Sequence, residues 1–354
     1  ALEAGKVMSY MNESKGTSVI RPVNELTIEE CKRLSLSRDK LVEMLRKMIR
    51  IRKFEERVES LFLVEGELIG PCHLYLGQEA IAVGVIEALS KDDLIISTYR
   101  GHGHAIARGV SMERLMAELY GRETGTCKGL GGSMHSAYQV EKGIIMVTAI
   151  VGSGIPIAVG VGYALKYKRL PKIVAVFFGD GAVNTGAFHE AVNLAAVKQV
   201  PVLFVCENNF YAFSVPHKKS FAGESIATRA ACYGMRSYLV YGNDVLSVYK
   251  AAREATEYVR ENNSPAFLEC RTYRMKGHGV YDKAAYRPRE EVEKWLKNDP
   301  INKFSKKLIQ LDILSEDDVK RLEWEVEAEV DEAVRKARSA KVLSFEELWN
   351  YIYA

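Results

Sequence analysis

The stretch that most constrains the fold runs from residue 172 to residue 209. Two apolar runs of strand length, at 172–178 and 201–206, flank a segment at 185–198 with helical spacing. A strand, a helix and a second strand in this order form a βαβ unit, whose strands are parallel and buried on both faces. Further strands alternate with helices along the chain. The sequence therefore predicts an α/β fold with a three-layer, doubly wound parallel sheet.

Polar residues end both of these strands. Asp180 lies between two glycines directly after the first strand, and Asn208 and Asn209 follow the second. Since α/β folds bind ligands at the carboxyl ends of their strands, we expect the carboxylate and both amides to meet at that edge. Carboxylate and amide oxygens suit Mg²⁺, with water and phosphate completing its shell. The helix that begins near Thr185 would direct its amino end toward the same edge, where anions are favoured.

The remaining segments divide the chain into three parts. We expect an N-terminal arm at 1–40, an α/β domain at 41–285 and a helical C-terminal arm at 286–354, where the sequence turns charged. The net charge of +3 is spread along the chain, which does not indicate nucleic acid as a partner. Apolar runs have strand length only, so no membrane helix is expected. The six cysteines form no CxxC pair and predict reduced, buried thiols in a cytoplasmic protein.

The Gly-Asp-Gly and Asn-Asn pair, with the helix and strand between them, resembles the thiamine diphosphate motif. Other segments strengthen the resemblance: "CHLYLGQEA", "STYRGHGHAIARG", "CKGLGGSMH" and "YRMKGHG". From about residue 40 to residue 340 the chain is similar to α subunits of the first component of 2-oxo acid dehydrogenase complexes and of acetoin dehydrogenases. The resemblance implies the thiamine diphosphate-binding fold.

The resemblance assigns a metal and diphosphate site. It implies that Asp180, Asn209 and the carbonyl of Tyr211 ligate Mg²⁺, which holds the diphosphate of thiamine diphosphate. It also implies further contacts to the cofactor from Tyr99, Arg100, Gly181, Ala182 and Arg274. An arginine fork suits a phosphate group because it binds two oxygens at once.

The resemblance also assigns the reacting end of the site. His73 and His278 are the implied catalytic residues, and His278 is expected to bind the cofactor as well. The main chain at Ala149 and Val151 would contact the aminopyrimidine ring. Ser133 and His135 are expected in a mobile loop near the site entrance. His102 and His104 have the spacing of a metal pair, but without a third ligand nearby we do not expect zinc.

The implied activity needs a second chain. The resemblance predicts an α subunit that decarboxylates a pyruvate-like 2-oxo acid or cleaves acetoin, and reductively acylates a lipoyl group. Thiamine catalysis also needs a glutamate at the aminopyrimidine ring, and this chain has room for one such α/β domain. The resemblance places that glutamate on a β subunit, in an α₂β₂ heterotetramer that serves a lipoyl-bearing acyltransferase.

Other readings stay open from the sequence. Branched-chain relatives tend to have arginine before the Asn-Asn pair, and Glu207 stands there in this chain, which favours pyruvate or acetoin. Pyruvate-specific relatives usually have an aromatic residue at the position of Pro71, which leaves the shape of the substrate pocket open. The alternatives are a branched-chain 2-oxo acid dehydrogenase α subunit, a transketolase-type half-enzyme and a non-catalytic scaffold subunit.

Overall fold

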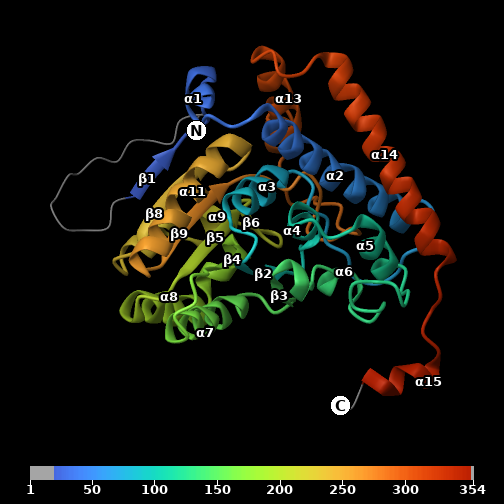
Figure 1. Cartoon of the computed structure of the whole chain (residues 1–354), viewed down its shortest axis with the longest axis horizontal. Coiled ribbons are helices and arrows are strands. Elements are labelled where there is room, and N and C mark those ends of the chain that lie inside the picture. Colours follow the sequence, from blue (N-terminus) through green and yellow to red (C-terminus); the bar gives the residue numbers. More distant parts are fainter. Residues whose placement is uncertain (1–19, 352–354) are drawn as a thin grey trace.

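A parallel sheet organises the chain, of which the computed structural model describes residues 20–351. Seven strands form this sheet in the order β1-β8-β9-β5-β4-β2-β3, and every pairing is parallel (Figure 1). They are β1 (Ile20–Val23), β2 (Leu94–Thr98), β3 (Ile144–Thr148), β4 (Val174–Gly179), β5 (Val202–Asn208), β8 (Arg236–Tyr241) and β9 (Ala266–Arg271). The predicted α/β fold is confirmed.

Two hydrophobic cores lie on the two faces of the sheet, because side chains alternate along each strand. In β4, Val174, Val176 and Phe178 face one core, while Ala175 and Phe177 face the other. The first core is covered by α7 (Gly154–Tyr167), α8 (Gly186–Lys198) and α10 (Ile226–Ala231). The second is larger and lies under α2 (Arg38–Leu63), α3 (Glu79–Ala88), α4 (His102–Ala107), α5 (Met112–Leu119) and α11 (Val245–Asn262). Figure 1 shows α7 and α8 on one side of the sheet and α2, α3 and α11 on the other.

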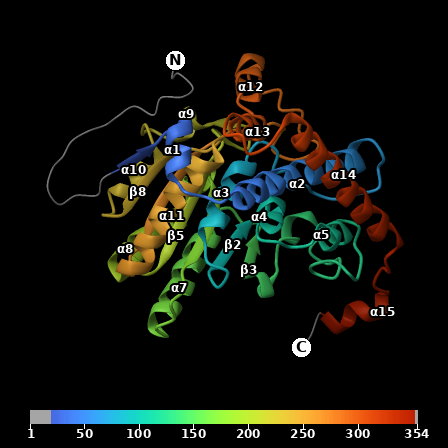
Figure 2. The same ribbon diagram turned by 45° about the horizontal axis from the view of Figure 1, so that its top comes forward.

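The C-terminal region is helical, as expected. Its helices are α12 (Arg289–Leu296), α13 (Pro300–Gln310), α14 (Glu316–Ser339) and α15 (Phe345–Leu348), followed by a short 3-10 turn at Trp349–Tyr351. Figure 2 shows α14 running along α2 and α5, and its buried apolar residues join the larger core. No helix among residues 20–351 has the length and apolar character needed to cross a membrane.

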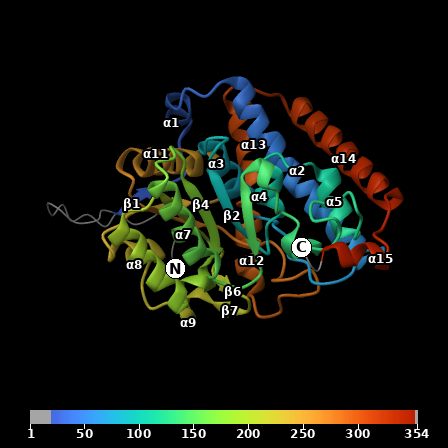
Figure 3. The ribbon, with the colours of Figure 1, turned by 60° about the horizontal axis from the view of Figure 1, so that its bottom comes forward.

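Short elements complete the edge of the sheet near its carboxyl ends. They are α6 (Gly132–His135), α9 (His217–Ser220), and the antiparallel hairpin of β6 (Tyr211–Ala212) and β7 (Val215–Pro216), while a 3-10 turn at Val140–Lys142 precedes β3 at its amino end. The hairpin lies beside α9 (Figure 3). All six cysteines are free, and four are buried. The expectation that the thiols are buried is wrong for the exposed Cys232.

The βαβ unit differs from its predicted bounds in two places. A 3-10 helix at Asp180–Asn184 separates β4 from α8, and the Thr185 hydroxyl caps α8 by accepting a hydrogen bond from the Phe188 amide. Strand β5 runs two residues further than predicted and includes Glu207 and Asn208. Both differences arise because polar residues here are fixed by tertiary contacts, which an apolar pattern does not register.

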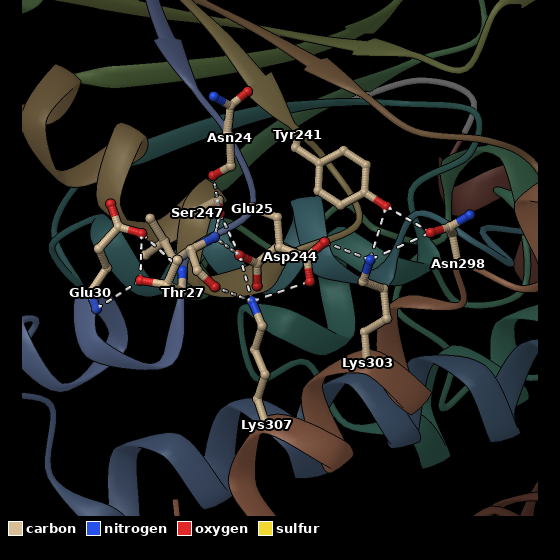
Figure 4. Close-up of polar contacts among 11 residues, drawn as sticks. Asn24, Glu25, Thr27, Glu30, Tyr241, Asp244, Ser247, Asn298, Lys303 and Lys307 are labelled. Atoms are coloured by element: carbon tan, nitrogen blue, oxygen red, sulfur yellow. Dashed lines mark hydrogen bonds and ion pairs between the residues drawn. The ribbon is translucent and has the colours of Figure 1, made fainter. Parts of the chain in front are cut away.

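A buried ionic cluster fastens the N-terminal segment and α13 to the α/β domain (Figure 4). The Lys307 Nζ lies 3.0 Å from the Asp244 carboxylate and donates to the Leu26 carbonyl at 2.9 Å. Lys303 pairs with Glu25 at 2.6 Å. Strand β1 and α1 (Ile28–Arg33) lie within the expected N-terminal arm, and β1 forms the outer strand of the sheet. Part of that arm therefore belongs to the sheet, and residues 1–19 lie outside the described range.

Replacing Lys307 by methionine should lower the free energy of unfolding by about 3 kcal/mol, because Asp244 stays buried without its cation. Urea unfolding at neutral pH measures this change. Lys306→Met is the matched control, since Lys306 is exposed on the same helix and should change the stability little. Equal unfolding midpoints for the two variants would contradict the role given to this cluster.

Candidate active site

One cavity at the carboxyl edge of the sheet collects the residues that the sequence singled out. Its volume is about 470 Å³, and the ends of β2, β4 and β5 open into it. All twelve predicted site residues line it: His73, Tyr99, Arg100, Ala149, Val151, Asp180, Gly181, Ala182, Asn209, Tyr211, Arg274 and His278. Residues scattered over two hundred positions of sequence therefore face a single space, at the edge where such sheets bind ligands.

Asp180 holds a carboxylate oxygen that has no partner. The residue is only 3% exposed, and its Oδ2 makes no hydrogen bond. Nδ1 of His217 lies 3.9 Å from this oxygen, which is too far for a hydrogen bond. A buried, unpaired carboxylate is costly unless a cation binds it. This feature fits a metal ion at the cavity wall.

The two adjacent asparagines face different surroundings. Asn209 lines the cavity, and its Oδ1 accepts a hydrogen bond from the Tyr211 amide at 3.4 Å. Asn208 points elsewhere: its Nδ2 donates to Glu269 Oε1 at 2.8 Å, and its Oδ1 accepts from the Phe210 amide. The expectation that both amides meet Asp180 is wrong for Asn208, because successive side chains in an extended chain point to opposite sides.

Most of the atoms at this wall that are available to bind a metal ion are oxygens. No group of three or more histidine, cysteine, aspartate or glutamate side chains within residues 20–351 is arranged to hold a metal. A hard cation that keeps water and phosphate ligands needs only one or two protein carboxylates. The wall beside Asp180 leaves little room for side chains, since a Cβ on Gly181 would lie 2.9 Å from that of Ala212. The donor set therefore fits Mg²⁺ better than zinc.

Two buried arginines give another part of the cavity lining a positive charge. Arg100 donates to the carbonyls of Leu74 and His278, at 2.6 and 2.8 Å. Arg274, 2% exposed, donates to the Phe213 carbonyl at 2.9 Å, and its Nε has no partner. Neither guanidinium forms an ion pair with a carboxylate in the described part of the chain. Burial and the charge of Arg100 lower the pKa of Arg274 to about 10. These features fit an anionic ligand.

Three rings cluster between the arginines and the cavity mouth. The centroids of His73 and His278 lie 4.9 Å apart, and Tyr99 lies 4.6 Å from His73. Nδ1 of His278 is 2.9 Å from Nη1 of Arg274. A guanidinium can only donate, so this nitrogen accepts and the proton of the neutral ring sits on Nε2. His278 is thereby fixed as a hydrogen-bond donor through Nε2, with its acceptor side occupied.

Both imidazoles should be neutral near pH 7 and should make stability depend on pH. Burial, followed by the charge of Arg100, lowers the pKa of His73 and of His278 to about 3. In an unfolded chain the imidazole pKa is about 6.5. As the pH falls from about 6.5 toward 3, the unfolded chain binds more protons than the folded one, so stability falls across this window. Above about pH 6.5 these two groups add no pH dependence.

The test compares the wild type with His73→Gln/His278→Gln. Urea unfolding midpoints between about pH 7.5 and pH 5 should decline more steeply for the wild type, because the variant lacks both depressed imidazoles. The difference between the two profiles removes the contribution of other ionisable groups. Parallel profiles would contradict the depressed pKa values.

The Gly-rich loop is anchored, contrary to the expectation that it is mobile. The carboxylate of Glu118, 1% exposed, accepts hydrogen bonds at 2.7–3.1 Å from four backbone amides of the loop, those of Cys127, Gly129, Gly131 and Gly132. Ser133 Oγ bonds His102 Nε2 at 3.1 Å, and Met134 lines the cavity. His135 is not at the cavity. A buried carboxylate on α5 thus holds a loop whose high glycine content suggested mobility.

The two histidines with metal-like spacing serve structural networks. Both ring nitrogens of His102 have partners, Glu55 at 3.0 Å and Ser133. His104 bonds Ser97 at 2.8 Å and Glu207 at 3.1 Å. Every ring nitrogen is occupied, so neither histidine is available to a metal. The prediction that this pair holds no zinc agrees with these contacts.

The cavity remains open where the main chain after β3 passes. Ala149 and Val151 line it, as the resemblance implied, and Gly152 has a φ of +85° that a side chain would disfavour. Ile150 is 73% exposed and Val151 is 54% exposed. Two adjacent large apolar side chains are therefore exposed at the cavity, a feature of surfaces that another chain covers.

Comparison with known proteins places this geometry in a family. A model of the family named Dehydrogenase E1 component matches residues 46–346, most of the chain. The chain belongs to the dehydrogenase E1 component family. This E1-family chain is 45% identical to the alpha subunit of acetoin:2,6-dichlorophenolindophenol oxidoreductase from Bacillus subtilis, over 86% of the chain and 90% of that relative.

Pyruvate-type relatives are also similar to this E1-family chain. The alpha subunit of the pyruvate dehydrogenase E1 component from Zymomonas mobilis is 39% identical, over 90% of each chain. That from Porphyra purpurea is 35% identical, over 93% of this chain and 97% of the relative. Members of this family are thiamine diphosphate-dependent oxidoreductases, so the predicted family, enzyme class and cofactor are confirmed.

Some residues that line the cavity of this E1-family chain were not predicted from the sequence. Gln78, Glu207 and Met134 line it, but none was predicted there. Glu207 could have been found as an acidic residue at the end of an otherwise apolar strand. Gln78 had a weaker signal, since a polar residue directly before a helix such as α3 is common. Met134 had no signal in the sequence, because its position depends on the loop that Glu118 holds.

Proposed function

We propose that this chain is the α subunit of an E1 enzyme that binds Mg²⁺ and thiamine diphosphate and acts on acetoin or pyruvate. The observation that carries the proposal is one cavity with an unpaired carboxylate on one wall and two unpaired guanidiniums on another. A magnesium diphosphate has the matching charges at its two ends. When bound, thiamine diphosphate supplies a nucleophilic carbon and an electron sink for cleaving a bond next to a carbonyl.

The residues of this chain would divide the work of binding. The Asp180 carboxylate, the Asn209 oxygen and the Tyr211 carbonyl would hold Mg²⁺. Arg100 and Arg274 would hold the diphosphate, with further contacts from Tyr99, Gly181 and Ala182. The main chain at Ala149 and Val151 would orient the aminopyrimidine ring. This division is supported by the position of all these residues at one cavity.

His73 and His278 would manage protons at the reacting centre. His278 offers its Nε2 proton to an oxygen of the substrate, because Arg274 occupies its Nδ1. His73 has a buried Nδ1 without a partner, so the ring is free to bind substrate or product. Neutral imidazoles in a partly buried cavity can stabilise developing charge and pass a proton.

A second polypeptide would complete the site. We propose a β subunit in an α₂β₂ heterotetramer, which supplies the glutamate at the aminopyrimidine ring. The apolar residues at the cavity mouth support this, and so does an exposed apolar face on α7 and α8. That face comprises Ile157, Tyr163, Tyr167, Leu194 and Val197. The two helices pack side by side (Figure 1), and these exposed residues are the proposed contact surface for the β subunit.

We also propose domain boundaries, a further partner and a cellular location for this chain. Residues 41–285 would form the cofactor domain, 286–354 the C-terminal arm, and 1–40 an N-terminal arm whose β1 joins the sheet. A lipoyl-bearing acyltransferase would accept the acyl group. Free cysteines, four of them buried, are compatible with a cytoplasmic location.

The proposal is tested by co-expressing the chain with a β subunit and assaying dye reduction with acetoin, pyruvate and branched-chain 2-oxo acids. We expect activity with acetoin or pyruvate only, dependent on Mg²⁺ and on the β subunit. The 45% identity to an acetoin-type relative supports acetoin, and the pyruvate-type relatives support pyruvate. Preference for branched-chain acids, ketol transfer between sugars, or no Mg²⁺-dependent cofactor binding would each refute the proposal in favour of one alternative.

A further inference from the structure

Gln78 lies beside the metal wall, yet nothing in the proposed site uses it. It precedes α3 as the N-cap residue, but its side chain makes no capping hydrogen bond. The residue is 1% exposed and lines the cavity. A buried amide normally satisfies both its donor and its acceptor. What Gln78 bonds is therefore informative.

The first partner of Gln78 is Asn209. Nδ2 of Asn209 donates to Oε1 of Gln78 at 2.9 Å, while Oδ1 of Asn209 accepts from the Tyr211 amide. The reverse orientation of the Asn209 amide would set its donor against the Tyr211 N–H. Asn209 is thereby held from both ends. Its oxygen is kept on the side of Tyr211, where the metal ligands are proposed.

The other end of Gln78 has no partner. Its Nε2 is buried and makes no hydrogen bond in the described part of the chain. Since Oε1 is occupied by Asn209, the free Nε2–H₂ group is a donor at the cavity wall. A buried donor without an acceptor is costly, so an oxygen of a ligand is the expected partner.

The residues on either side of Gln78 are held by contacts to other parts of the chain. The Gly77 amide donates to both oxygens of Glu79 at 3.1 Å. Gly77 has a φ of +96°, and a Cβ there would collide with the Tyr273 carbonyl. Arg52 joins Glu79 to Asp299, at 2.8 Å from each, and Asp299 caps α13. A chain of contacts thus runs from the C-terminal region to the backbone of Gly77, next to Gln78.

We propose that Gln78 is a positioning residue of the magnesium diphosphate site, which turns the Asn209 oxygen toward the metal and donates its free Nε2–H₂ to an oxygen of the bound ligand. The inference rests on the proposed function. Groups that orient metal ligands typically change metal affinity or activity about 10- to 100-fold when they are replaced. Gln78 acts on the metal through Asn209 and on the ligand directly.

Calorimetric titration of thiamine diphosphate into the complex with the β subunit tests this. Gln78→Glu keeps an acceptor for Asn209 but replaces the donor by a negative oxygen, so the Kd should rise about 10- to 100-fold at saturating Mg²⁺. Gln78→Met removes both bonds at similar length. It should also raise the Mg²⁺ concentration for half-saturation about tenfold, because Asn209 loses its orientation.

Gln139→Glu is the matched control. Gln139 is a buried glutamine outside the cavity whose oxygen accepts from Arg114, so its variant should keep the wild-type Kd. Wild-type Kd and Mg²⁺ requirement in both Gln78 variants would overturn the inference. Lower unfolding midpoints without a change in Mg²⁺ requirement would also overturn it, in favour of a structural role. If the wild type showed no Mg²⁺-dependent binding, the proposed function would fail, and this inference with it.

Discussion

Replacing Asp180 by asparagine should abolish Mg²⁺-dependent binding of thiamine diphosphate and lower kcat at least about 1000-fold. The side chain keeps its shape, but the charge that a divalent cation needs is gone. Asp180 is the carboxylate of the metal wall that has an oxygen without any partner. The measurement is a titration of thiamine diphosphate into the complex with the β subunit, followed by a dye-reduction assay.

The same substitution elsewhere provides the control. Asp312→Asn changes an exposed residue with a φ of +54°, a conformation that asparagine tolerates well. It should leave both affinity and kcat unchanged. The unfolding midpoint of the Asp180 variant without cofactor should not fall, because its carboxylate oxygen has no hydrogen bond to lose at Oδ2. A variant that still binds thiamine diphosphate in a Mg²⁺-dependent manner would contradict the metal assignment.

Replacing Arg274 by methionine should separate affinity from stability. The Kd for thiamine diphosphate should rise at least about 100-fold, because a buried charge-assisted contact to the diphosphate is lost. Stability without cofactor should change by less than about 2 kcal/mol, since the guanidinium has no ion pair and donates only to neutral acceptors, the His278 ring and the Phe213 carbonyl. Burial, followed by the charge of Arg100, already lowers its pKa to about 10, so the residues around it disfavour the cation.

Arg260→Met is the contrasting variant. Arg260 pairs with the fully buried Asp93 at 2.7 Å, near the amino end of β2. Removing it should cost about 3 kcal/mol of stability and leave the Kd unchanged, because Asp93 loses its cation far from the cavity. Urea unfolding and calorimetry on the same preparations measure both quantities. Equal effects of the two substitutions on stability and on Kd would contradict the assignment of Arg274 to the ligand.

The α/β architecture and the main site can be predicted from the sequence because both depend on local patterns of apolar and polar residues. Apolar runs of strand length around a helix predict β4, α8 and β5, and polar residues at the strand ends predict where Asp180 and Asn209 meet. The resemblance then supplies distant residues such as Arg274. All of these residues reach the cavity because the parallel sheet brings their strand ends to one edge.

Contacts between distant segments explain what the sequence does not predict. Asn208 and Asn209 look alike in sequence, but their side chains point to opposite sides of the chain, and Asn208 bonds Glu269 on β9 instead of facing the cavity. The Gly-rich loop reads as mobile until four of its amides meet Glu118. Gln78 gains its place through Glu79 and Arg52, whose pairing spans separate helices. Such contacts leave no periodic signal in the residues that make them.

The central claim is that this chain supplies the metal and diphosphate half of a shared active site. The most direct test titrates thiamine diphosphate into the wild-type complex with the β subunit, once with Mg²⁺ and once with EDTA. The account predicts one binding site per α chain with Mg²⁺ and affinity at least about 100-fold weaker in EDTA. Equal affinity in the two buffers, or no binding in either, would contradict it.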